Sequence, residues 1–324
     1  MYNISEKYFS RLVFFAKILI IAGAYYIISG RIKDHGSFDA SLLTNQIGSF
    51  ELLDYSFMLL LLIFTFTNWV LEIIKWKSLV LFIKPISFGN SAKQSLASLT
   101  ASLITPNRIG EYGAKAVYYQ KNERSKILLL NFLSNVMQMS VTLIFGCLGS
   151  FILWDKITFL TAQRESFNGF LIASILFIAT AIILKNKWMG IYISARNQML
   201  KIPHSILKKS SLYSFLRYLV FSHQFYLFLI FFNVDIEYST AMSIIFLMYF
   251  ISSVIPGFVI FDWLVKGSVA VSLFGFFGVD ELVILSITSL MWMLNFALPS
   301  LVGMIFVLTF DESSVTLRQR KIVK

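Results

Sequence analysis

The sequence has 324 residues, of which 57% are hydrophobic and 14% are charged, and its mean hydropathy is +0.74. Soluble domains carry about 25% charged residues, so this composition excludes an ordinary soluble protein. The net charge of +11 would suit a nucleic-acid-binding protein. In a membrane protein it is better explained by Lys and Arg gathered on the cytoplasmic side, and we expect no nucleic-acid partner.

Six apolar stretches are long enough to cross a bilayer as helices, because a hydrocarbon core of roughly 30 Å needs about 20 apolar residues. They lie near residues 12–30, 56–74, 128–153, 168–184, 213–232 and 282–309. No strand-like alternation accompanies them, which argues against a closed β-barrel. The sequence therefore predicts an all-α polytopic membrane protein, with residues 1–324 forming a single transmembrane domain.

The segments between these stretches differ in charge. Lys and Arg gather in residues 1–11, 75–93, 120–127, 185–212 and 310–324, and are sparse in residues 31–55, 154–167, 233–238 and 279–281. Because cytoplasmic loops carry an excess of Lys and Arg, we expect a multi-pass protein of the cytoplasmic (inner) membrane. Both termini are expected in the cytoplasm.

The segment 95–119 is apolar but interrupted. Residues 95–105 would reach only ~15 Å as a helix, which is half of the membrane. Pro106 ends this helix because proline disfavours helical geometry in the residue before it, and Thr105 suits the cap of a second helix. Basic residues flank the segment on both sides, so we expect a re-entrant hairpin that opens to the cytoplasm. Such backbone is tolerated where protein or a water-filled cavity surrounds it.

The segment 239–278 has a similar pattern. In both segments an acidic residue follows a proline within six positions, and a lysine stands four residues after the acid. Residues at that spacing share one helix face and can form an ion pair. The prolines are Pro106 and Pro256, and the pairs are Glu111–Lys115 and Asp262–Lys266. The flanks of the second segment are acidic, which predicts a hairpin that opens outward; two full spans over 239–278 are the alternative.

The order of elements is the same in the two halves of the chain. A span, a broken segment and another span occupy residues 56–153, and the same order returns over residues 213–309 in the opposite orientation. Inverted repeats with interrupted helices near the midplane are typical of transporters. We therefore expect six full spans and two broken or re-entrant hairpins, arranged as an inverted repeat.

Arg108 is the leading candidate for binding an anion. A helix that begins inside the membrane presents unpaired N–H groups and a partial positive charge, and such ends bind phosphate. Arg108 adds a full charge there, while Glu111 and Lys115 neutralise each other. Asn107 and Gly110 complete this candidate site. The alternative is that the ion pair pins the hairpin and that Arg108 extends to the cytoplasmic headgroups.

Two polar stripes follow helical spacing. Asn68, Glu72 and Trp76 would form a polar wall against the first hairpin, or alternatively part of the interfacial belt in which Trp and Lys are common. The second stripe is expected to hydrogen-bond between helices. It consists of Asn131, Asn135 and Gln138.

The motif residues resemble one protein family, the flippase-like, lysylphosphatidylglycerol synthase transmembrane-region family. The resemblance covers roughly residues 10–310 and is carried by Thr-Pro-Asn-Arg-Ile-Gly-Glu-Tyr-Gly at 105–113, Pro256-Gly257, and Asn68…Glu72…Lys75-Trp76. In that family a related membrane domain is fused to an aminoacyl-transfer domain and flips the modified lipid. Here that soluble domain is absent, so lipid lysylation is not implied. Asp262 and Lys266 stand where Glu and Arg are more usual.

These features together predict a lipid translocase rather than an enzyme. It would move an anionic phospholipid or a polyprenyl-phosphate-linked lipid, with Arg108 holding phosphate and Pro256, Asp262 and Lys266 gating the second hairpin. No nucleophile–base pair or metal-ligand spacing is present in the sequence, so no metal or cofactor is expected. The alternatives are an integral-membrane transferase acting on a lipid-linked substrate and a non-catalytic partner in an envelope-synthesis complex.

The predicted topology can be tested by labelling single cysteines in a Cys147→Ser background. A membrane-impermeant thiol reagent added to intact cells should reach cysteines at Gly36 and Ile236. It should miss cysteines at Lys201 and Arg320, because the positive-inside rule places them in the cytoplasm. Labelling of position 201 in intact cells would overturn this topology.

Overall fold

The computed structural model describes residues 55–103, 105, 107–154, 197–255 and 262–310. Within these residues the chain is helical and contains no strand. The helices are α3 (Tyr55–Val80), α4 (Phe88–Leu103), α5 (Ile109–Ala116), α6 (Lys121–Ile152), α10 (His204–Phe231), α11 (Tyr238–Val254), α12 (Asp262–Gly275), α13 (Glu281–Trp292), the π-helix η3 (Met293–Ala297) and α14 (Leu298–Leu308). The predicted spans 12–30 and 168–184, Pro256 and both termini lie outside the described residues.

Four helices in the described part of the chain are long and apolar enough to cross a membrane. They are Ser56–Val80, Lys121–Ile152, His204–Phe231 and the continuous run Glu281–Leu308, and each covers one of the predicted spans. Large apolar side chains lie on their outer surfaces, as Phe66, Phe151 and Leu308 show with exposed fractions of 71%, 78% and 73%. Water would make such a surface costly, whereas lipid tails would not. The protein is therefore a helical membrane protein.

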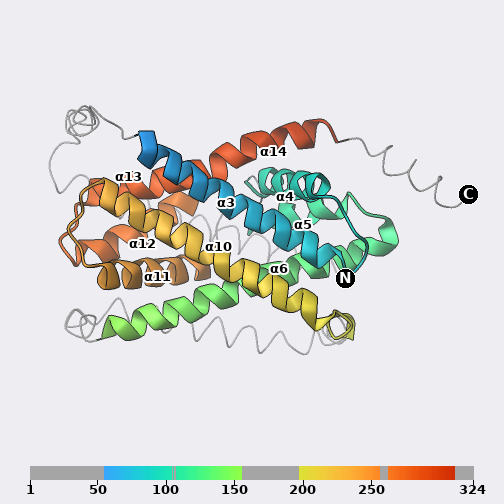
Figure 1. Ribbon diagram of the computed structural model, residues 1–324, viewed down its shortest axis with the longest axis horizontal. Coiled ribbons are helices and arrows are strands. Elements are labelled where there is room, and N and C mark those ends of the chain that lie inside the picture. The colour runs from blue at the N-terminus through green and yellow to red at the C-terminus, as the bar shows by residue number, and fades with distance from the viewer. Residues whose placement is uncertain (1–54, 104, 106, 155–196, 256–261, 311–324) are drawn as a thin grey trace, which may run out of the picture.

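Two pairs of shorter helices accompany the long ones. Helix α4 packs against α5, and α11 packs against α12. Figure 1 shows the α4–α5 pair toward one end of the long helices and the α11–α12 pair toward the other. Helix α14 covers α4, and α6 runs along α11.

The turn between α4 and α5 is held by one threonine and one glycine. The Thr105 hydroxyl donates to the Ala101 carbonyl at 3.1 Å and accepts from the Gly110 amide at 2.8 Å. A Cβ atom at Gly110 would lie 2.2 Å from the Ala101 oxygen, so a larger residue does not fit. Thr105 therefore bonds an amide in the first turn of α5, but the predicted cap position was wrong, because the N-cap residue of this helix is Arg108.

Two boundaries of the predicted hairpin were wrong. Helix α4 begins at Phe88 instead of residue 95, and its 16 residues reach about 24 Å rather than half of the membrane. Its added polar residues become helical because α3 satisfies them: Ser91 donates to the Ile73 carbonyl at 2.7 Å, and Gln94 accepts from the Trp76 indole at 2.8 Å. Helix α5 begins at Ile109, so Arg108 is its N-cap residue rather than part of its first turn.

The two ends of the α4–α5 pair lie close together. Lys84, which precedes α4, forms an ion pair of 3.1 Å with Glu123 in the first turn of α6. Glu123 also closes a capping box with Gln120, which starts α6 directly after α5. The pair therefore leaves the bundle at the end where it entered.

Cysteine labelling can test this return of the chain. Cysteines placed singly at Lys93 and Lys121, both exposed, should react from the same side of the membrane in a Cys147→Ser background. The expected side is cytoplasmic because both flanks are basic. Labelling of the two positions from opposite sides would show that residues 95–119 cross the membrane.

Candidate functional site

Lys115 and Glu111 form a buried ion pair on α5. The lysine ammonium donates to the Glu111 carboxylate at 2.8 Å and to the Asn131 side-chain oxygen at 2.7 Å, and it lies 4.3 Å from the centre of the Trp76 ring. The exposed fractions are 1% for the Lys115 side chain and 8% for the Glu111 side chain. The predicted pairing is therefore confirmed. Its burial is tolerable because both charges are compensated.

Glu72 is the second buried carboxylate. One of its oxygens accepts from Lys75 and from Arg217 of α10, each at 2.7 Å. The Arg217 guanidinium also donates to the Asn68 side chain at 2.9 Å. The polar wall predicted at Asn68 and Glu72 exists, and its main partner is α10; Trp76 alone faces α4 and α5.

Neither Lys75 nor Arg217 was assigned to the candidate site from the sequence, although Lys75 belongs to the motif that carries the family resemblance. Lys75 was expected in a cytoplasmic segment, 75–93, but α3 continues to Val80 and the Lys75 side chain is only 1% exposed. Arg217 stands in a predicted membrane span, where an unpaired arginine would be very costly. That cost was the available signal that Arg217 has a buried acidic partner.

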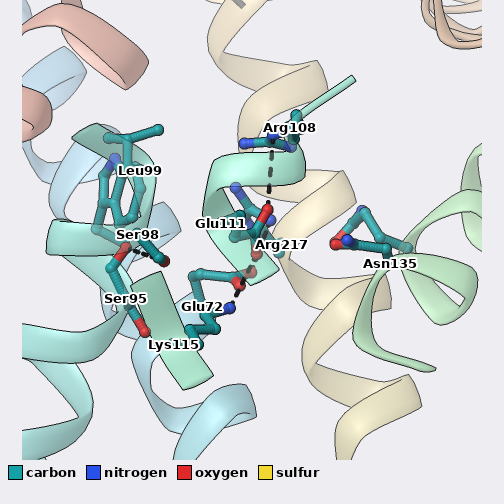
Figure 2. Close-up of a pocket in the computed structure, with 11 residues that line it drawn as sticks. Glu72, Ser95, Ser98, Leu99, Arg108, Glu111, Lys115, Asn135 and Arg217 are labelled. Atoms are coloured by element: carbon teal, nitrogen blue, oxygen red, sulfur yellow. Dashed lines mark hydrogen bonds and ion pairs between the residues drawn. The ribbon is translucent and has the colours of Figure 1, made fainter. Parts of the chain in front are cut away.

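The two buried carboxylates border one pocket (Figure 2). Helices α3, α4, α5, α6 and α10 contribute to it together with Arg108. Its lining residues are Trp69, Glu72, Ser95, Ser98, Leu99, Arg108, Glu111, Lys115, Asn135, Gln138 and Arg217. The cations Arg108, Lys115 and Arg217 outnumber the carboxylates Glu72 and Glu111, and Lys75 adds a further positive charge beside Glu72. The pocket therefore has an excess of positive charge.

Arg108 reaches this pocket from a strained backbone. Its φ of 57° lies in the left-handed region, which costs a non-glycine residue roughly 1–2 kcal/mol. Its Nε atom lies 3.7 Å from the Glu111 carboxylate, and its side chain is 40% exposed. Arg108 is thus the most exposed of the three cations that line the pocket. Its backbone is held in a left-handed conformation.

Asn107 and Gly110 were predicted to complete the anion site, but neither residue lines the pocket. Asn107 is exposed and supplies a left-handed turn residue, with φ of 50°. The Gly110 amide is already bonded to Thr105, so it is not free to bind phosphate as expected of the helix start. The positive charge of this region therefore comes from side chains, of which Arg108 is the most exposed, and the Gly110 amide adds no free N–H group.

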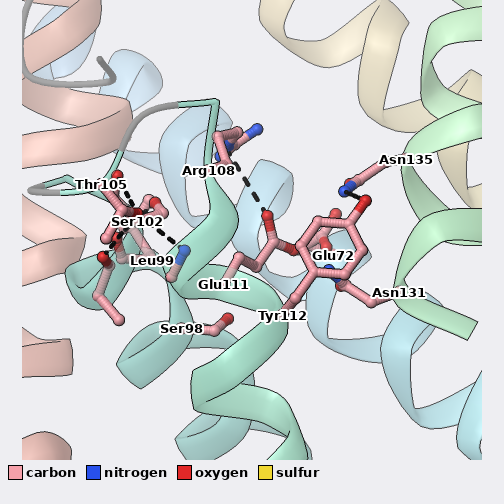
Figure 3. A network of polar contacts seen from close by, with 12 residues as sticks. Glu72, Ser98, Leu99, Ser102, Thr105, Arg108, Glu111, Tyr112, Asn131 and Asn135 are labelled. Atoms are coloured by element: carbon pink, nitrogen blue, oxygen red, sulfur yellow. Dashed lines mark hydrogen bonds and ion pairs between the residues drawn. The ribbon is translucent and has the colours of Figure 1, made fainter. Parts of the chain in front are cut away.

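The stripe on α6 makes the interhelical hydrogen bonds that were predicted, and Figure 3 shows two of its members, Asn131 and Asn135, beside Tyr112. Asn131 accepts from Lys115, Asn135 donates to the Tyr112 hydroxyl at 3.2 Å, and Gln138 donates to the Ser214 carbonyl at 3.4 Å.

Some buried polar atoms at the pocket have no hydrogen-bond partner among the residues that the structure describes. Among them are the Ser95 hydroxyl, the Arg108 Nε and the Gln138 side-chain oxygen, and all three residues line the pocket. Buried polar groups are nearly always satisfied, so atoms of this kind are suited to a polar ligand or to water.

A chain of buried amides continues from the pocket to Gln224, in the C-terminal half of α10. Asn68 donates to Asn295 at 2.8 Å, Asn295 donates to Gln224 at 2.9 Å, and Gln224 donates to Thr65 at 2.8 Å. Neither Asn295 nor Gln224 was foreseen, because each is an isolated amide in an apolar span. Such bonds hold membrane helices together.

The second predicted ion pair, Asp262–Lys266, is also present. Its atoms are 2.5 Å apart, and the side chains are 28% and 24% exposed. The pair lies in the first turns of α12 and does not line the charged pocket. Within the described residues no group of His, Cys, Asp and Glu is arranged to hold a metal ion.

The buried pair predicts unequal effects of two carboxylate substitutions on stability. Glu111→Gln should leave the Lys115 charge buried without its counter-ion, which typically costs about 3–5 kcal/mol. Glu123→Gln, the matched control, breaks an ion pair with a half-exposed lysine and should cost less than about 1 kcal/mol. The measurement is the melting temperature of purified protein in detergent. Equal losses for the two variants would show that the Glu111–Lys115 pair contributes little to stability.

No protein-family model, curated protein or solved structure matches this chain. The resemblance to the flippase-like family therefore stays a prediction.

Proposed function

We propose that this chain is a flippase-like protein of the inner membrane, which moves an anionic phospholipid or a polyprenyl-phosphate-linked lipid between leaflets. The observation that carries the proposal is the pocket with excess positive charge, which lies between three long apolar helices, α3, α6 and α10, and the α4–α5 pair. Ionisable groups at membrane depth are costly and usually functional. A phosphate headgroup supplies the negative charge that this pocket lacks.

Arg108 is the residue best suited to hold that phosphate. Its guanidinium can bind phosphate through paired, charge-assisted hydrogen bonds, whereas lysine provides a point charge. The carboxylate of Glu111 holds Lys115 and lies 3.7 Å from Arg108, which keeps the cations in place before a headgroup arrives. The acyl chains would stay in the bilayer, against the exposed apolar surface of the helices.

The arrangement of the helices supports the transporter class. A long helix, a short pair and a long helix occur in α3–α6 and again in α10–α14, and the two short pairs lie toward opposite ends of the bundle (Figure 1). We propose that residues 56–153 and 213–309 are inverted repeats and that Asp262–Lys266 and Pro256 belong to the gate on the outer side. Transporters with such repeats bind substrate between them near the midplane.

Reconstitution in liposomes tests the proposed activity. Liposomes containing labelled lipids with anionic or zwitterionic headgroups should show faster movement of the anionic lipids between leaflets when the protein is present. Recovery of the lipids after the assay separates the rival functions, because a transferase would change the lipid covalently. Absence of movement for every headgroup would contradict the proposal.

Substitutions of Arg108 test the assigned site. Arg108→Ala should weaken binding of anionic lipid about 10- to 150-fold, which corresponds to the loss of a charge-assisted contact worth roughly 1.5–3 kcal/mol. Arg108→Lys should keep part of the affinity, because it keeps the charge and loses the paired geometry. The melting temperature should change little in either variant, since Glu111 and Lys115 remain paired. Wild-type affinity in Arg108→Ala would show that Arg108 is an interfacial anchor.

A further inference from the structure

The last long helix is interrupted by a π-helix. Helix α13 ends at Trp292, the π-helix η3 covers Met293–Ala297, and α14 continues from Leu298. The Leu298 amide donates to the Met293 carbonyl, which is the wide turn of a π-helix. Such single turns are rare and occur frequently at functional sites. Asn295 in this turn belongs to the chain of buried amides, and Phe296 is the next residue along the turn.

Phe296 contacts cations from both pairs of short helices. The Arg108 guanidinium carbon lies 5.9 Å from the centre of its ring, and the Lys266 ammonium lies 5.1 Å from the same point. Both distances are within the ~6 Å over which an aromatic ring attracts a cation. Arg108 precedes α5 and Lys266 lies in the first turns of α12, so Phe296 lies where the ends of the two pairs come together.

We propose that Phe296 is a positioning residue that aims Arg108 into the charged pocket and links this pocket to the Asp262–Lys266 pair. Among the described residues, the Arg108 side chain has an ion pair of 3.7 Å to Glu111 and the contact with this ring, so the ring is one of its two supports. Lys266 is held in the same way, between Asp262 and the rings of Phe296 and Tyr249. A headgroup released from Arg108 would pass the Phe296 ring and then meet Lys266 as the next cation.

The lipid-binding test of this inference rests on the proposed function. The contact of Phe296 with two cations rests on the geometry alone. A ring that merely filled space would be replaced well by leucine. A ring that acts through its negative face would lose its effect as fluorine atoms withdraw that charge, even though its shape is nearly unchanged. Graded fluorination therefore separates the two roles.

The experiment introduces mono-, di- and trifluorophenylalanine at position 296 and measures binding of short-chain phosphatidylglycerol to the purified protein in detergent. Affinity should fall stepwise, by roughly 2- to 5-fold in total, which is the value of an accessible cation–π contact. Phe296→Leu should match the trifluoro protein, and Phe296→Tyr should retain wild-type affinity. The same series at Phe132, a ring on α6 that is 49% exposed, is the control and should change nothing.

Melting temperature gives a second readout that does not require lipid. Lys266→Gln should lower the melting temperature less in the trifluoro protein than in the wild type, because the contact between Lys266 and the ring is already weakened. A flat fluorination series together with equal effects of Lys266→Gln in the two backgrounds would overturn the proposal. If the wild type binds no phosphatidylglycerol, the proposed lipid site fails, and the melting comparison still decides whether Phe296 links the two cations.

Discussion

The structure depends on the pairing of two carboxylates with four cations inside an apolar bundle. Glu111 lies against Lys115 and Arg108, and Glu72 lies against Lys75 and Arg217. Charges at this depth are tolerable only when partners surround them, so each pairing also fixes where two helices meet. Glu72 joins α3 to α10, and Lys115, through Asn131, joins α5 to α6. The pocket is the space that these fixed helices enclose.

The features that follow from local spacing could be predicted from the sequence. Four spans were recognisable because a bilayer requires a certain apolar length, and both ion pairs were recognisable because residues four apart share a helix face. The partner of Glu72 on another helix could not be found in this way. Arg217 lies 145 residues away, and only the packing of α10 on α3 brings the two together.

The errors at the first hairpin have the same origin. The polar residues before position 95 contain no hydrophobic run, yet they are helical because Ser91 and Gln94 bond to α3. Hydropathy measures what lipid would accept and does not register polar groups that another helix satisfies. The π-turn at Met293–Ala297 escaped prediction for a related reason, since its residues look like any apolar helix until Asn295 finds its partners on α3 and α10.

The carboxylates also set how strongly such a pocket can hold an anion. A transport site must bind well enough to admit its substrate and weakly enough to release it. Four uncompensated cations would bind phosphate too tightly to let it go and would be costly to bury in its absence. With Glu111 beside Arg108, a phosphate bound as proposed would exchange one anionic partner of the guanidinium for another, and only the remaining excess of positive charge would favour binding. The carboxylates that lower the free-energy cost of burying these cations therefore also make the proposed binding reversible.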